Sequence, residues 1–142
     1  MISPMMRQPY FLTLCLALIA SGCSNDRLPL GQVSGTVTLD GIPLENAYLE
    51  FQPTNGRSSL GITDSSGHYI LNYDNETKGA LIGAHKVFIT TQIESRPVGE
   101  SGEPAVVGRK ELLPSRYHSN SELTADVKSG TNTVNFDLTT KK

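Results

Sequence analysis

The chain reads Val33-Ser34-Gly35-Thr36-Val37-Thr38-Leu39, followed by the dipeptide Asp40-Gly41. Successive side chains of a β-strand point to opposite faces, so Val33, Val37 and Leu39 share one face, and the serine and the threonines share the other. This alternation predicts a strand with one buried face. Asp-Gly adopts the positive φ angles of tight turns, so we expect the strand to end there.

Three more strands are predicted directly downstream. In the first, Ala47, Leu49 and Phe51 are expected to face the core, and a proline follows them. Residues 60–63 and 69–73 then flank Asp64-Ser65-Ser66-Gly67. Aspartate bonds main-chain groups within a turn, and glycine accepts a left-handed φ, so this pattern predicts a hairpin with a loop of about four residues.

The rest of the chain contains three further predicted strands and one long connection. Residues 83–91, 123–127 and 134–138 alternate, with a turn expected at residues 129–132. From about residue 92 to residue 120 the periodicity disappears, which predicts a flexible loop of about 92–120 that is either functional or disordered. Within it, residues 111–118 are expected to form a docked turn in which a leucine from Leu112-Leu113 and Tyr117 pack on the edge of the domain. About seven short strands with frequent turns predict an all-β sandwich.

Composition restricts the class of protein. The 142 residues carry a formal net charge of −2 and no long basic run, so nothing indicates a nucleic-acid partner. The length suits one domain with a substantial core. Both cysteines, Cys15 and Cys23, precede the predicted sandwich, which therefore has neither a disulfide framework nor a cysteine metal site.

The first 22 residues have the pattern of a secretory leader. Arg7 precedes an apolar run at residues 11–20, which has the length of a signal-peptide core and is too short to span a bilayer comfortably. The run leads into Ala20-Ser21-Gly22-Cys23, which resembles a bacterial lipobox, although Ala20 stands where leucine is usual. The resemblance implies cleavage before Cys23 and acylation, as with palmitate, of its thiol. Two or more acyl chains anchor a protein stably.

We therefore expect a lipoprotein signal peptide at residues 1–22, Cys23 as the lipidation site, and a polar tether at residues 23–31. An ordinary signal peptide with an incidental cysteine is the alternative. Ser24, and not aspartate, follows the cysteine. By analogy with enteric bacteria, this favours transfer to the outer membrane.

Several segments resemble carboxypeptidase regulatory-like domains. Residues 33–47 are similar to their opening strand and turn, residues 63–69 to their central turn, and residues 83–89 to their strand of glycine, any, Tyr or His, any, Val, any, Ile. Residues 113–117 and 135–138 resemble a version common in small planctomycete-type lipoproteins. The resemblance covers roughly residues 32–138 of the predicted domain, which is expected at residues 32–140. It implies a seven-stranded transthyretin-like (prealbumin-like, Ig-like) β-sandwich, without catalytic activity and without a cofactor.

The sequence offers few groups for catalysis. His68, His85 and His118 are expected in a turn, a strand and a loop, and no nucleophile elbow, metal-binding histidine pair or phosphate loop is present. Transthyretin-like hydroxyisourate hydrolases end in Tyr-Arg-Gly-Ser, whereas this chain ends in Thr-Thr-Lys-Lys. No catalytic residue is therefore predicted.

Two alternatives concern binding. Asp64 and the serines beside it could hold calcium, but an EF-type loop needs more acidic residues, so an Asx-type turn is expected and no metal site is predicted. Tyr48 and Phe88 could form an exposed patch, although single exposed apolar residues are ordinary.

The sequence thus predicts a non-catalytic lipoprotein of the bacterial cell envelope, anchored to the outer membrane through lipid on Cys23, with a structural or binding role. Its partner would be an envelope protein or a glycan. A carbohydrate- or peptide-binding accessory module and a secreted, unanchored domain are the alternatives. Exposed aromatic side chains in a stripe would favour a glycan, an exposed edge strand would favour a protein partner, and a pocket of histidines and acids would favour an enzyme.

Overall fold

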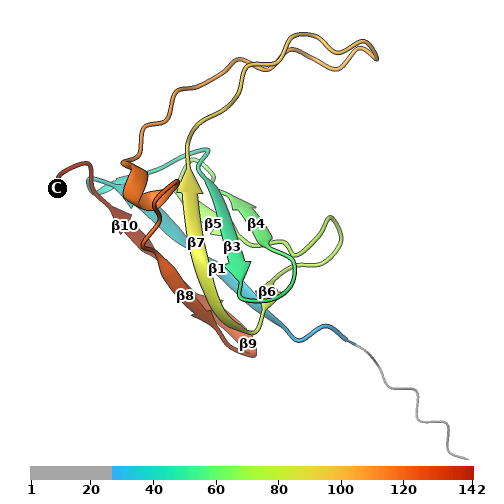
Figure 1. Cartoon of the computed structure of the whole chain (residues 1–142), viewed down its shortest axis with the longest axis vertical. Coiled ribbons are helices and arrows are strands. Elements are labelled where there is room, and N and C mark those ends of the chain that lie inside the picture. The colour runs from blue at the N-terminus through green and yellow to red at the C-terminus, as the bar shows by residue number, and fades with distance from the viewer. Residues whose placement is uncertain (1–26) are drawn as a thin grey trace, which may run out of the picture.

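The computed structural model describes residues 27–142, which form a two-sheet, all-β sandwich (Figure 1). The predicted all-β sandwich is thereby confirmed. The elements are β1 (Leu30–Leu39), β2 (Ile42–Pro43), β3 (Tyr48–Pro53), β4 (Ser59–Ile62), β5 (His68–Ile70), β6 (Ala80–Leu81), β7 (Gly83–Thr90), the 3-10 helix η1 (Ser115–Tyr117), β8 (Thr124–Val127), β9 (Gly130–Thr133) and β10 (Phe136–Leu138). The predicted signal peptide, Cys23 and the first part of the tether lie outside the described residues.

Strand β1 is the centre of the first sheet. It pairs antiparallel with β6, β5 and β2 along one edge and parallel with β9 and β10 along the other. The second sheet has the order β4-β3-β7-β8, and all its pairings are antiparallel. The chain therefore passes from one sheet to the other four times, between β2 and β3, β4 and β5, β6 and β7, and β8 and β9.

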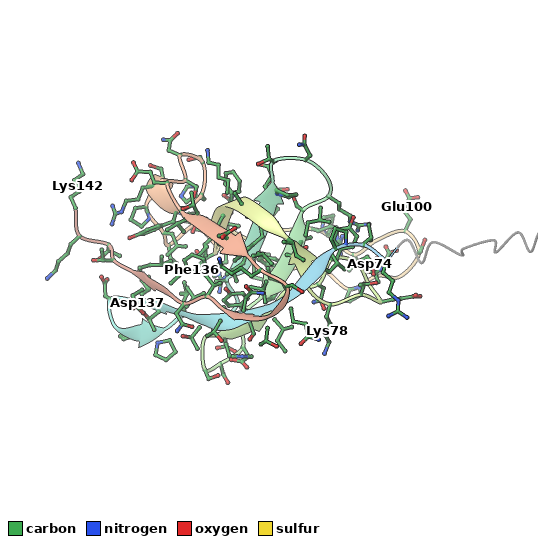
Figure 2. The ribbon with its side chains drawn as sticks, turned by 90° about the horizontal axis from the view of Figure 1, so that it is seen from below. Asp74, Lys78, Glu100, Phe136, Asp137 and Lys142 are labelled. Atoms are coloured by element: carbon green, nitrogen blue, oxygen red, sulfur yellow. The ribbon has the colours of Figure 1, made fainter. Side chains whose placement is uncertain are left out.

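The core lies between the two sheets, as the alternation predicts. Val33, Val37, Leu49 and Phe51 are each at most 1% exposed. Figure 2 shows Phe136 of β10 in the interior, and its ring lies 6.1 Å from the ring of Phe51 in the opposite sheet. Leu113 and Tyr117, predicted to pack on the edge of the domain, are buried as well.

The last predicted strand, residues 134–138, is wrong in extent, and so is the turn at residues 129–132. Residues 130–133 form β9 instead, and the main chain leaves β1 at Val134 before β10 begins. A Cβ on Gly35 would lie 1.8 Å from the Val134 carbonyl oxygen, so the two parallel main chains approach each other closely where only glycine fits. The Val134 carbonyl accepts a hydrogen bond from Tyr69 Oη at 2.7 Å.

The predicted hairpin at residues 60–73 is only partly formed. Its turn is present, because the Asp64 amide donates to the His68 carbonyl at 2.9 Å. Further along, Leu60 and Asn72 form an antiparallel bridge. However, β4 pairs with β3 and β5 pairs with β1, so the two arms of the hairpin belong to different sheets. Between the turn and the Leu60–Asn72 bridge, the two arms are not paired with each other at Ile62 and Ile70.

Residues 92–110 project from the sandwich as a two-stranded arm, which is called the arm below (Figure 1). Ile93 and Arg109 exchange two main-chain hydrogen bonds of 2.9 and 2.8 Å, and Arg96 and Val106 exchange two of 3.0 and 2.8 Å. The arm leaves at the end of β7, whereas the described chain begins at the other end of the sandwich (Figure 1). Whether this stretch is flexible stays a prediction.

Candidate functional site

An open groove of about 520 Å³ lies on the outer surface where β4 and β5 separate, and it is called the groove below. Its floor consists of Tyr48, Leu60, Ile62 and Ile70. These side chains are 43%, 57%, 52% and 42% exposed, respectively. Tyr48 lies directly opposite Ile62 in the β3–β4 register. A gathering of large apolar side chains in one concave place is typical of a binding surface, whereas scattered ones are ordinary.

Polar and charged side chains form the rim of the groove. Arg57 lies with its guanidinium 5.9 Å from the ring centre of Tyr73, a cation–π arrangement that holds both side chains at one end. Asp74 follows Tyr73, and Asp64 and His68 line the groove as well. The groove therefore combines an apolar floor with two carboxylates and one guanidinium.

Both rim carboxylates are fixed by the turns they stabilise. Asp64 Oδ1 accepts hydrogen bonds from Ser66 N, Ser66 Oγ and His68 N at 2.9, 2.7 and 3.0 Å, which confirms the predicted Asx-type turn. These bonds, first the one from the Ser66 side chain, lower the pKa of Asp64. Asp74 Oδ1 accepts from Glu76 N and Thr77 N, and the bond from Glu76 is the main cause of its lowered pKa. Both groups are therefore anionic at neutral pH.

Leu60 and Ile62 point outward because their sequence neighbours, Gly61 and Thr63, face the core. Thr63 is 2% exposed, and its hydroxyl accepts from Ala47 N at 2.9 Å and donates to the Leu44 carbonyl at 2.5 Å. A Cβ on Gly61 would lie 3.0 Å from a Leu71 methyl and 3.1 Å from the Ile70 carbonyl oxygen. With Gly61 and Thr63 facing inward, strand alternation places the two larger apolar residues on the surface.

The histidines and aromatic residues singled out from the sequence lie apart from one another. His85 is 3% exposed, and its Nε2 lies 2.6 Å from the Leu81 carbonyl oxygen, while the His118 Nε2 lies 3.0 Å from the Leu113 carbonyl oxygen. Tyr48 belongs to the groove, whereas Phe88 lies opposite Glu50, beneath the Lys86 ammonium at 5.4 Å. Cys23 lies outside the described residues.

Glu111 is a polar residue that sequence reasoning missed. Its carboxylate accepts hydrogen bonds from Thr91 N, Thr91 Oγ1, Leu112 N and Leu113 N at 3.0, 2.6, 3.0 and 3.0 Å, and another from the Thr90 hydroxyl. Beside it, Arg109 Nε donates to the Thr91 carbonyl at 2.7 Å. Glu111 thus closes the base of the arm and connects β7 to the buried segment around Leu113. No local pattern marks it, because the hydroxyls of Thr90 and Thr91 and the Thr91 amide lie about twenty residues away in the sequence.

Two absences within the described residues concern metal binding and membrane insertion. Within residues 27–142, no cluster of three or more His, Cys, Asp or Glu side chains has the arrangement of a metal site. The same part of the chain contains no helix long and apolar enough to cross a bilayer.

Comparison with known proteins adds little to this geometry. No protein-family profile and no curated protein matches the chain. It is similar to a 9R-lipoxygenase from Cyanothece PCC8801, with 20% identity and a TM-score of 0.41 over 78% of this chain and 16% of that chain. It is also similar to a DUF3823 family protein from Parabacteroides merdae ATCC 43184, with 15% identity and a TM-score of 0.39 over 78% of this chain and 46% of that chain.

The chain thus spans less than half of either structure. The second neighbour has the same kind of all-β fold, and the likeness is weak. At these TM-scores neither likeness carries an argument about activity or partners.

Proposed function

We propose that the protein is a non-catalytic binding module of the bacterial cell envelope, anchored to the outer membrane through lipid on Cys23, and that the groove is its binding site. The observation that carries the binding role is the floor of the groove. Four large apolar side chains there, Tyr48, Leu60, Ile62 and Ile70, are each more than 40% exposed. Leaving this surface in water has a free-energy cost of about 25 cal/mol per Å², which a bound ligand would remove.

The state of the polar groups supports a non-catalytic role. The carboxylates of Asp64, Asp74 and Glu111 accept hydrogen bonds from main-chain amides, and His85 and His118 bond to main-chain carbonyls. A general base must instead be within reach of a substrate proton. These groups act in turns and in the core.

The proposed family is that of carboxypeptidase regulatory-like domains with a transthyretin-like sandwich, in the form found in planctomycete-type lipoproteins. Its support is the sequence resemblance at residues 33–47, 63–69 and 83–89. The support for the anchor is Ala20-Ser21-Gly22-Cys23 after an apolar run. Cleavage there would leave a tether of residues 23–31 before the sandwich.

The binding role is tested with the neutral apolar dye Nile red, whose fluorescence increases on apolar surface. The double variant Leu60→Thr, Ile62→Thr places β-branched residues with high strand propensity at both positions and is expected to fold normally and to lose most of the dye signal. Ile82→Thr is the matched control, because Ile82 is 43% exposed and lies outside the groove. Equal dye signal from all three proteins would refute the groove as a binding surface.

The anchor is tested separately by intact-mass analysis of the protein purified from membranes, with and without Cys23→Ala. A chain that begins at Cys23 with added acyl mass, lost in the variant, is the expected result. A mature chain without lipid would make the protein a secreted, unanchored domain.

A further inference from the structure

We infer that the groove binds a short extended peptide that carries apolar side chains at alternate positions and a lysine or arginine beside them. This inference rests on the proposed binding function and names the chemical class of the ligand. It follows from three features of the groove: its open main-chain groups, the spacing of its floor, and the charge of its rim.

The main chain of the groove is open where the floor is most apolar. Leu60 and Asn72 exchange main-chain hydrogen bonds of 2.9 and 2.8 Å across the corner, and Asp64 N donates to the His68 carbonyl at 2.9 Å. In the same register, Ile62 would face Ile70, but these two residues form no β-bridge. Since peptide groups of residues two apart on a strand point the same way, those of Ile62 and Ile70 face the opening. A peptide ligand carries the donors and acceptors that such groups need, which a lipid chain does not.

The spacing of the floor fits an extended chain. Leu60 and Ile62 are two residues apart on β4, so their side chains are separated by about 6.7 Å along the strand. A peptide in the β conformation repeats its own same-face side chains at that interval, so alternate side chains can lie beside and between them. The floor is mainly aliphatic, and of the three tyrosines that line the groove, Tyr69 is buried and Tyr73 is covered by Arg57. This composition favours a peptide over a sugar ring, which binds best on open aromatic faces.

The charge of the rim favours a basic residue in the bound peptide. Asp64 and Asp74 are two anionic groups on the rim, and Arg57 is the single arginine or lysine among the lining residues. The Arg57 guanidinium lies over the Tyr73 ring. The rim therefore has net negative charge, and a lysine or arginine in the ligand complements it.

The experiment is a selection of random heptapeptides displayed on phage against the purified protein, with the Ile62→Thr variant as a parallel target. Selected sequences are then synthesised, and their affinities are measured by fluorescence anisotropy. Peptides with apolar residues at alternate positions and a basic residue should be enriched on the wild-type protein. Their affinity should fall about tenfold in Ile62→Thr and stay unchanged in the Ile82→Thr control. Asp74→Asn should weaken peptides that contain Lys or Arg more than neutral analogues, and added salt should reduce this difference.

The inference is overturned by equal enrichment on both targets, by selected peptides without alternation, or by affinities that Ile62→Thr leaves unchanged. It is also overturned if an oligosaccharide array, probed in parallel, gives binding that Ile62→Thr abolishes while no peptide is enriched. In that last case the groove variants still lose Nile red signal, so the proposed binding function stands and only the ligand class is wrong. If the groove variants kept the full Nile red signal and no peptide were enriched, the proposed binding function itself would be wrong.

Discussion

The Glu111→Gln substitution would remove one charge from the base of the arm and change almost nothing in shape. Partial burial acts to raise the pKa of the Glu111 carboxyl, but the hydrogen bonds from Thr90, Thr91 and Leu113 outweigh it and lower that pKa from 4.5 to about 2. At about 1.4 kcal/mol per pH unit, this difference corresponds to about 3 kcal/mol of folding free energy. Because the carboxylate is partly solvated, screening reduces the expected contribution to about 1.5 kcal/mol.

The variant should therefore unfold more easily than the wild type at pH 7. The glutamine amide also turns a donor toward main-chain N–H groups, which adds about 1 kcal/mol to the loss. We expect the free energy of unfolding, measured by urea denaturation with circular dichroism, to fall by about 2.5 kcal/mol in total. Glu94→Gln on the exposed part of the arm is the matched control, and it should change stability by less than about 0.5 kcal/mol.

The same variant gives a pH test with a definite sign. A depressed pKa in the folded state means that the stabilisation is complete above about pH 4.5 and is lost as the pH falls toward 2. The difference between wild type and Glu111→Gln should therefore shrink between pH 5 and pH 2.5. Equal stability at pH 7, or a difference that stays constant down to pH 2.5, would refute the reasoning, because the second result would point to a steric cause.

Three further predictions concern the core, the close approach at Gly35 and the arm. Phe136→Ala should lower the free energy of unfolding by about 3–5 kcal/mol through cavity formation, whereas Phe88→Ala on the outer face should cost far less, as denaturant midpoints would show; similar losses would contradict the core assignment. Gly35→Ala should cost about 3 kcal/mol or prevent folding, since the new Cβ would lie 1.8 Å from a main-chain oxygen, and a normal melting temperature would count against this close approach. Limited proteolysis should cut within residues 93–109 and spare residues 111–121, and mass spectrometry of the fragments would reveal the opposite order.

The alternation of apolar and polar residues was sufficient to predict the strands that turn one face toward the core. Val33, Val37, Leu49 and Phe51 are all buried as predicted, because each alternates with a polar or exposed neighbour. Alternation defines the face of a side chain but not the strand beside it. The division of the hairpin between the two sheets was therefore not predictable from residues 60–73.

The groove could not be predicted from the sequence for a related reason. Leu60 and Ile62 are the larger apolar residues of their strand, so hydrophobicity alone would assign them to the core. The inward positions are instead taken by Gly61 and Thr63, and Thr63 is satisfied there by hydrogen bonds to distant main-chain atoms. Strand β9 was missed because Gly130–Thr133 has no apolar alternation and is held through its main chain and Asn132.

The position of β1 has a mechanical consequence. This strand directly follows the residues that would join the sandwich to a lipid at Cys23, and it is paired in parallel with β9 and β10 near the other end of the chain. Tension between the membrane and the C-terminus would pull β1 and β10 past each other in opposite directions along their length. Their hydrogen bonds would then be loaded together in shear and not opened one after another. The sandwich is thus built to resist stretching along the same axis by which the proposed anchor would hold it.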